Sequence, residues 1–191
     1  MTDIILASAS PRRAELLNQI GIKYEVQVAD IDESCLPSET AELLVQRLAV
    51  EKSQTVKSKL PVLGSDTLGV LNCDLLVKPR DFTHAHKMLS KMSGNWHEIL
   101  SAVAISYHGK TKVRLNKNRV LFRTLSQDEI KAYWDTGEPQ DKAGAYAVQG
   151  IGASFIQRIE GSYSGIMGLP LFETTQLLND VGIKVLGNHK V

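Results

Sequence analysis

The distribution of apolar and polar residues along this chain predicts short strands that alternate with amphipathic helices. The apolar run at 4–7 is typical of a buried strand. Ser10 and Pro11 follow it, a pair that favours the start of a helix with the serine hydroxyl as the N-cap. Apolar residues at helical spacing then predict a helix that ends at Gly21. The chain is therefore expected to begin with a strand, a tight turn and a helix.

The same two periods recur through the rest of the sequence. They predict helices after Asp81 through Met92 and at 38–57, 126–137 and 170–180. The helix at 126–137 is expected to begin with a capping box, with Ser126 as the N-cap and Glu129 at N3. The two periods also predict strands at 24–28, 61–71, 75–77, 99–105, 113–122 and 155–159. A turn at 107–110 joins two of these strands into a hairpin, and the glycine-rich stretch at 137–170 predicts long loops of the kind that often carry function. Together these elements indicate an α/β class and a single domain spanning residues 1–191.

Composition narrows the classes of function. Hydrophobic residues make up 43% of the chain and charged residues 23%, which is typical of a folded globular protein. The formal net charge of +1 gives no general attraction to nucleic acid polymers or membranes, so neither is expected as a partner. No apolar run reaches membrane-spanning length, and the first residues lack the order of a signal peptide. Because Cys35 and Cys73 form no CxxC motif, a cytoplasmic protein with reduced thiols is expected.

The turn at 8–13 is a candidate phosphate site. A strand, small residues and a helix start direct free backbone N–H groups and the positive end of the helix dipole to one point. Arg12 and Arg13 lie in the first helical turn, where a cation is unfavourable unless an anion is bound. Spacing alone equally allows a serine-capped helix with solvated arginines. The turn matches neither the GxxxxGK[ST] nor the GxGxxG phosphate-binding motif.

Asp66 interrupts the apolar strand at 61–71. An unpaired carboxylate is unfavourable in such a strand, so Asp66 needs a cation, a metal ion or a cluster of donors as its partner. In a cleft it would hold a divalent metal or activate a water for attack on phosphorus, and the alternative is a structural carboxylate that caps a loop. Glu33, in the acidic segment 30–33, is a candidate second metal ligand, with a solvated acidic turn as the alternative.

Other candidates carry weaker signals. Lys52, Lys78 and Arg80 would add positive charge around a triphosphate, although isolated basic residues are more often solvated. Gln149 follows a run of small residues and has an amide that can pair with the edge of a base. The histidines lack the spacing of metal ligands, and no Ser-His-Asp or Cys-His arrangement is evident. Covalent catalysis is therefore not expected.

Taken in order, these motifs closely resemble those of the Maf family of nucleoside triphosphate pyrophosphatases. The matching segments are LASASPRR at 6–13, DIDE at 30–33, RLAVEK at 47–52, GSDT at 64–67, KPRD at 78–81, LSKMSG at 89–94, DKAGAYAVQG at 141–150 and GSYSGIMGLP at 161–170. The resemblance covers nearly the whole chain. It implies an α/β fold with a mixed, elongated, twisted sheet, helices, and two lobes flanking a central cleft. By analogy it also implies a homodimer.

The resemblance further implies a reaction. Members of the family hydrolyse a nucleoside triphosphate between its α- and β-phosphates with a divalent cation, Mg²⁺ or Mn²⁺. On this basis Asp66 is the expected proton acceptor, and Glu33 and Asp66 are the expected metal ligands. The expected substrate-binding residues are Ser8, Arg12, Arg13, Lys52, Thr67, Lys78 and Gln149. Ser65 stands where the family usually has alanine, and its hydroxyl is expected to add a hydrogen bond beside Asp66.

The resemblance also bears on the base. The AGAY and VQG segments resemble those of the branch that prefers dTTP and UTP, whereas the branch acting on 7-methyl-GTP has a different segment there. The amide of Gln149 can pair with the carbonyl and imide N–H of thymine or uracil, while Thr67 shapes the pocket. Three rival functions also stay open: a Maf enzyme that prefers 7-methyl-GTP, a house-cleaning enzyme for modified nucleotides, and a nucleotide-binding regulator of septum formation without significant turnover.

Overall fold

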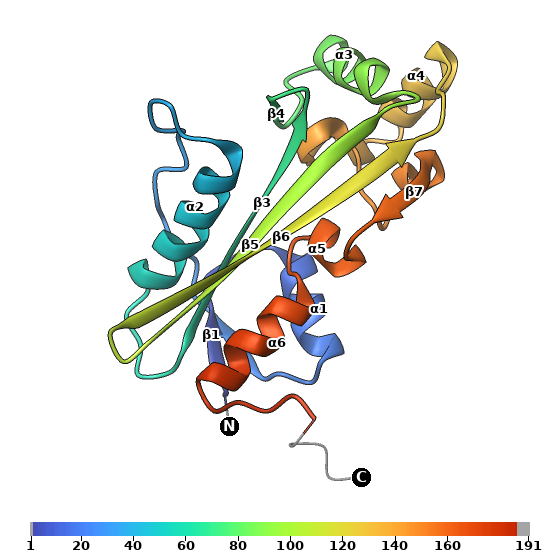
Figure 1. Ribbon diagram of the computed structural model, residues 1–191. Coiled ribbons are helices and arrows are strands. Elements are labelled where there is room, and N and C mark those ends of the chain that lie inside the picture. The colour runs from blue at the N-terminus through green and yellow to red at the C-terminus, as the bar shows by residue number, and fades with distance from the viewer. Residues whose placement is uncertain (1, 187–191) are drawn as a thin grey trace. The chain divides into compact units, whose positions relative to one another are not determined.

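A computed structural model describes residues 2–186 of the protein (Figure 1). Its strands are β1 (Ile4–Leu6), β2 (Tyr24–Val26), β3 (Val62–Leu71), β4 (Asp74–Leu76), β5 (Trp96–Tyr107), β6 (Lys110–Phe122) and β7 (Ile156–Glu160). Its α-helices are α1 (Pro11–Gln19), α2 (Ala41–Thr55), α3 (Phe82–Met92), α4 (Gln127–Asp135), α5 (Tyr163–Met167) and α6 (Leu171–Asp180). Three short 3-10 helices lie in the glycine-rich stretch: η1 (Glu138–Asp141), η2 (Ala143–Ala145) and η3 (Ile151–Phe155). The predicted α/β class is confirmed.

The strands form one sheet of mixed direction, as predicted. Their order is β2-β1-β3-β5-β6-β7, and β4 pairs with β3. β1 runs parallel to both β2 and β3, whereas β4 is antiparallel to β3, and β7 to β6. Only His108 and Gly109 separate β5 from β6, and their φ angles of 48° and 73° are those of a type I′ hairpin turn. The predicted hairpin is therefore present, with strands longer than expected.

The chain divides into two compact units. The first runs to Thr67, includes Ser101–Asn116 and resumes at Gly168. The second comprises Leu68–Leu100 and Lys117–Met167, so β3, β5 and β6 contribute residues to both units. A single domain with a central cleft stays a prediction. Within residues 2–186, no helix combines the length and the apolar character needed to cross a membrane.

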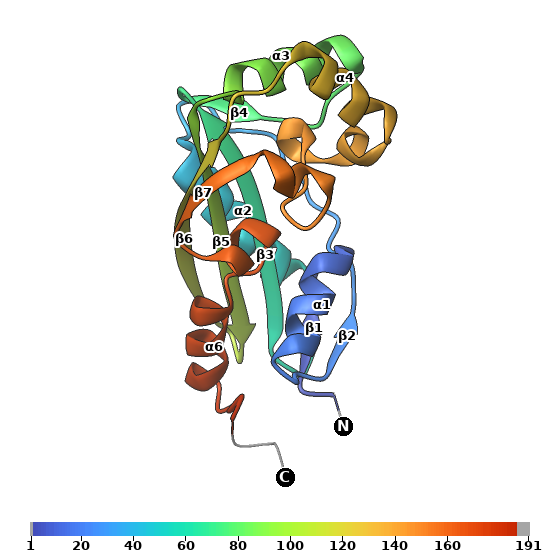
Figure 2. The same cartoon turned by 90° about the vertical axis from the view of Figure 1, so that its right-hand side faces the viewer.

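In the first unit, β1 lies at the centre of the core, because its three residues are at most 2% exposed. Helix α2 covers one face of the part of the sheet that belongs to this unit, and α1 and α6 cover the other face, as two views at right angles show (Figures 1 and 2). Gly64 of β3 lets α2 approach closely: a Cβ there would lie 2.4 Å from the carbonyl oxygen of Ala49 and 2.6 Å from the amide nitrogen of Ser53. This close packing brings Lys52, on α2, next to β3.

In the second unit, α3 and α4 lie side by side (Figures 1 and 2). Phe82 and Trp134 join the two helices with ring centroids 6.0 Å apart. The same unit contains an aromatic cluster in which the ring of Phe122 lies 4.9 Å from that of His97 and 4.8 Å from that of Tyr146. These edge-on contacts are the favoured geometry for aromatic rings, and they stabilise the core beside the glycine-rich stretch.

Two helix starts show how local sequence sets the boundaries. Helix α4 begins with the predicted capping box, in which the side chains of Ser126 and Glu129 each bond to the other's backbone N–H. Helix α2 begins at Ala41 rather than at 38, because Thr40 is its N-cap and accepts a hydrogen bond from the amide of Leu43.

Candidate active site

The turn after β1 is built around the hydroxyl of Ser8. This buried oxygen accepts hydrogen bonds from the amide of Ser10 at 3.2 Å and from Nη1 of Arg13 at 2.9 Å. Ser10 occupies the N-cap position of α1, but its side chain makes no capping hydrogen bond, so the predicted hydroxyl cap is wrong. Ser8 satisfies the amide before the helix, and the N–H groups of the first helical turn are left without a side-chain cap. That arrangement suits an anion.

The two arginines of this turn differ in their surroundings. Nε of Arg13 donates to the carbonyl oxygen of Gly168 at 2.9 Å, in addition to its bond to Ser8. Burial lowers the pKa of the Arg13 guanidinium, and the charge of Asp66 opposes that shift. Arg13 is therefore a fixed, partly buried cation rather than a solvated one. The side chain of Arg12 makes no hydrogen bond or ion pair within residues 2–186, so its guanidinium is free to bind a ligand.

Asp66 has the cationic partner that its buried position requires. Nζ of Lys52 lies 2.6 Å from Oδ1 of Asp66 and 2.6 Å from Oε1 of Glu33. The side chains of Lys52 and Asp66 are 10% and 9% exposed, whereas that of Glu33 is 60% exposed. Burial raises the pKa of Asp66, the charges of Lys52 and Arg13 lower it, and the charge of Glu33 adds to the rise. The structure thus brings together three predicted site residues from a loop, a helix and a strand.

The residues on either side of Asp66 bond elsewhere. Oγ1 of Thr67 lies 2.8 Å from Oγ of Ser101. The fully buried hydroxyl of Ser65 lies 2.8 Å from the carbonyl oxygen of Ala102 and 3.0 Å from that of Gly168. The hydroxyl of Ser65 thus adds a hydrogen bond beside Asp66, as expected, but on the opposite face of β3, because successive side chains of a strand point to opposite faces.

Gly168 is a residue that the sequence did not single out. Its carbonyl oxygen accepts hydrogen bonds from both Arg13 and Ser65, and its φ of 114° lies in a region that favours glycine. A Cβ at this position would lie 3.4 Å from Oγ1 of Thr67. Gly168 thus anchors Arg13 beside β3, and its only sequence signal is its place in the motif that ends at Pro170.

Lys78 and Gln149 belong to the second unit. Both are exposed, Lys78 in the segment after β4 and Gln149 in the turn before η3. The backbone carbonyl of Val77 accepts a hydrogen bond from the amide of Gly144 at 3.0 Å, which ties the Lys78 segment to the glycine-rich stretch. Their roles in substrate binding stay predictions.

Glu138 holds the loop that carries Gln149, and sequence reasoning missed it. Its carboxylate accepts hydrogen bonds from the amides of Ile151 at 2.7 Å and Gly152 at 3.0 Å, and from the hydroxyl of Tyr133 at 2.7 Å. A Cβ on Gly150 would lie within 2.5 Å of all three carboxyl atoms of Glu138, so only glycine allows this contact. The only available signal was the position of Glu138 beside a glycine-rich stretch.

The contacts among Lys52, Asp66 and Glu33 are here called the network around Asp66. The family model described as Maf-like protein matches residues 3–181, which include every residue of this network. This chain belongs to the Maf family. Many curated proteins are similar to it over nearly their whole length. The dTTP/UTP pyrophosphatase of Hahella chejuensis is 50% identical, with 95% of this chain and 94% of that protein covered. The corresponding proteins of Methylobacillus flagellatus (50% identical, 99% and 98% covered) and Neisseria meningitidis serogroup B (47% identical, 96% and 96% covered) have the same name.

Among solved structures, that titled "The structure of the Staphylococcus aureus Ham1 protein" is also similar. Its TM-score is 0.46 and its sequence identity is 16%, with 76% of this chain and 86% of that chain covered. At this level the likeness bears on neither activity nor substrate.

The network of this Maf protein is suited to proton transfer. A carboxylate whose pKa is raised binds a proton more readily than an ordinary aspartate, which is what a general base requires. Asp66 and Glu33 also fit the divalent cation that the family implies, because both carboxylates already converge on one positive charge, that of Lys52. Mg²⁺ is commonly held by one or two carboxylates, with substrate phosphates and water completing its shell. Residues 2–186 contain no cluster of three or more His, Cys, Asp or Glu side chains that would complete it from the protein alone.

Proposed function

We propose that this protein is a nucleoside triphosphate pyrophosphatase that hydrolyses dTTP and UTP to the monophosphate and pyrophosphate. The observation that carries the proposal is the buried Asp66 carboxylate, in contact with Lys52 and with its pKa raised by burial. Support also comes from the relatives at 47–50% identity that are named dTTP/UTP pyrophosphatase.

In the proposed reaction a water molecule attacks the α-phosphorus, and Asp66 accepts its proton. A bond forms between the water oxygen and the α-phosphorus, the bond from that phosphorus to the bridging oxygen breaks, and pyrophosphate leaves. Lys52 holds Asp66 in position through their hydrogen bond of 2.6 Å. Asp66 and Glu33 are the residues that would hold a divalent cation, Mg²⁺ or Mn²⁺, whose charge would offset that of the phosphates.

The turn at Ser8 binds the phosphates in this proposal. The fixed guanidinium of Arg13 and the unpaired one of Arg12 supply charge, and the first-turn N–H groups of α1 supply hydrogen bonds. Positioning and electrostatic stabilisation account for most of the catalysis of phosphoryl transfer, so these contacts matter as much as the base.

The base preference rests on Gln149 and Thr67, whose contacts with thymine or uracil stay predictions. The test is a panel of dTTP, UTP, 7-methyl-GTP, dATP and modified pyrimidine triphosphates, assayed for pyrophosphate and monophosphate with Mg²⁺ or Mn²⁺. Preferential release of pyrophosphate from dTTP and UTP is expected. Preference for 7-methyl-GTP or a modified nucleotide would overturn the substrate assignment, and no product from any substrate would favour the non-catalytic regulator.

Two further expectations stay predictions: a homodimer, which rests on the resemblance, and a cytoplasmic location, which rests on composition. Both cysteines are free and exposed. Sedimentation of the purified full chain will decide the oligomeric state, and a single species of monomer mass would contradict the homodimer.

A further inference from the structure

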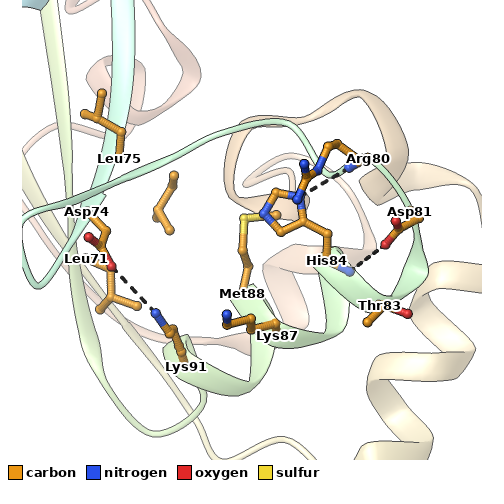
Figure 3. Close-up of a pocket in the computed structure, with 11 residues that line it drawn as sticks. Leu71, Asp74, Leu75, Arg80, Asp81, Thr83, His84, Lys87, Met88 and Lys91 are labelled. Atoms are coloured by element: carbon orange, nitrogen blue, oxygen red, sulfur yellow. Dashed lines mark hydrogen bonds and ion pairs between the residues drawn. The ribbon is translucent and has the colours of Figure 1, made fainter. Parts of the chain in front are cut away.

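The second unit contains a hollow between the hairpin of β3 and β4 and the helix α3, here called the α3 pocket (Figure 3). Its volume is about 490 Å³, within the range of small-molecule sites, roughly 300–1,000 Å³. Its floor is apolar, because Leu71, Leu76 and Met88 are each at most 7% exposed. Leu75 is 37% exposed and adds apolar surface. A flat apolar group can therefore be covered here.

Basic side chains line the same pocket. Arg80 lies just before α3, and His84, Lys87 and Lys91 follow at spacings of three and four residues, which places them on one face of the helix. Figure 3 shows Arg80 and His84 together at one end, with Lys87 and Lys91 on the following turns. Lys87 and Lys91 are four residues apart on α3, a spacing at which like charges repel each other, so an anion bound near them would be stabilising.

The two carboxylates of the pocket, Asp74 and Asp81, interact with groups other than Arg80 and Lys87. Asp74 pairs with Lys91 at 3.6 Å. Asp81 is the N-cap of α3, and its Oδ1 accepts the amide N–H of His84 at 2.7 Å. Within residues 2–186, neither the guanidinium of Arg80 nor the ammonium of Lys87 has an ion-pair partner. The pocket therefore has excess positive charge.

His84 adds a ring N–H donor. Its Nδ1 accepts the backbone N–H of Arg80 at 3.4 Å, and in the neutral ring this places the proton on Nε2. Three different donor groups, on Arg80, His84 and Lys87, thus line one apolar hollow. A phosphate group has enough oxygens to accept from all three, and the planar guanidinium suits two of those oxygens at once.

We propose that the α3 pocket binds a small organic phosphate, with its phosphate on Arg80, His84 and Lys87 and its flat ring on Leu76 and Met88. No residue of the pocket belongs to the network around Asp66. The binding itself is independent of the proposed function; a nucleoside monophosphate is the member of this class that the proposed reaction would supply.

The test is a titration of the full chain with uridine monophosphate, followed by the ring signals of His84 in NMR spectra and assigned with a His84→Asn variant. We expect the His84 signals to shift, and Lys87→Glu to weaken this binding by about tenfold or more, because it removes one charge-assisted contact. Lys59→Glu makes the same charge change at an exposed lysine outside the pocket and should leave the binding unchanged.

Three smaller probes separate the sources of binding. Uridine lacks the phosphate, inorganic phosphate lacks the ring, and hexanoate combines an apolar chain with a carboxylate. Weaker binding of all three than of uridine monophosphate supports the proposal. An unchanged affinity in Lys87→Glu, or tighter binding of uridine or hexanoate, would overturn it. Pyrophosphate release by Lys87→Glu is expected to match that of the unmodified protein, so failure of the pocket and failure of the proposed function are distinguishable.

Discussion

Nζ of Lys52 lies 2.6 Å from Oδ1 of Asp66, and both side chains are almost fully buried. Removal of one member of such a pair leaves an uncompensated charge in the interior. We expect Lys52→Met to lower the free energy of unfolding by about 3–5 kcal/mol at pH 7, measured by urea denaturation. The double variant Lys52→Met with Asp66→Asn should be more stable than Lys52→Met alone, because it leaves no buried carboxylate without its partner; Glu33 also loses Lys52 but is 60% exposed. If the double variant is no more stable, the ion pair does not account for the effect.

Stability should also depend on the titration of His97. Burial lowers the pKa of this imidazole from 6.5 to about 4, so between these values the unfolded chain binds more protons than the folded one. The free energy of unfolding is therefore unaffected by this titration above pH 6.5 and falls by about 3 kcal/mol in total as the pH is lowered to 4. Unfolding of His97→Gln across this range should lack this component, while His108→Gln, which changes an exposed histidine, should retain it. Equal pH dependence in both variants would exclude His97 as the source.

Glu138 should act on substrate binding through the loop that carries Gln149. Glu138→Ala removes the acceptor for the amides of Ile151 and Gly152, so the loop loses its fixed conformation. We expect KM for dTTP to rise by about tenfold with a much smaller change in kcat, since roughly 1.4 kcal/mol of binding is lost. The KM of Glu138→Gln should lie between those of the unmodified protein and Glu138→Ala. Glu160→Ala, at another carboxylate of the second unit, should leave KM unchanged. A fall in kcat at constant KM would contradict a positioning role.

The sequence allowed prediction of those features that depend on neighbouring residues. The capping box of Ser126 and Glu129 and the hairpin turn at Gly109 are local patterns, and both are present. The need of Asp66 for a partner also followed from its apolar strand. Its partner could not be identified from spacing, because contact with Lys52 depends on how closely α2 packs against Gly64, which is a tertiary feature.

One prediction was wrong and two residues were missed because contacts in the folded chain decide each case. A hydroxyl cap from Ser10 was expected from the serine-proline pair, but Ser8, two residues earlier, accepts the bonds of this turn instead. The roles of Gly168 and Glu138 depend on bonds to residues distant in sequence, such as that from Arg13 to Gly168. The order of the motifs was enough to indicate the family, whereas these contacts could be identified only in the folded chain.

The most direct test of the account is the rate of pyrophosphate release from dTTP by Asp66→Asn, with Asp135→Asn as a matched change at an exposed carboxylate. If Asp66 accepts the proton of the attacking water, the rate should fall by about 10²–10⁴-fold. The free energy of unfolding should fall by less than in Lys52→Met, because Glu33 still pairs with Lys52 and burial already disfavours the charged form of Asp66. A folded Asp66→Asn variant with near-normal turnover would contradict the central claim.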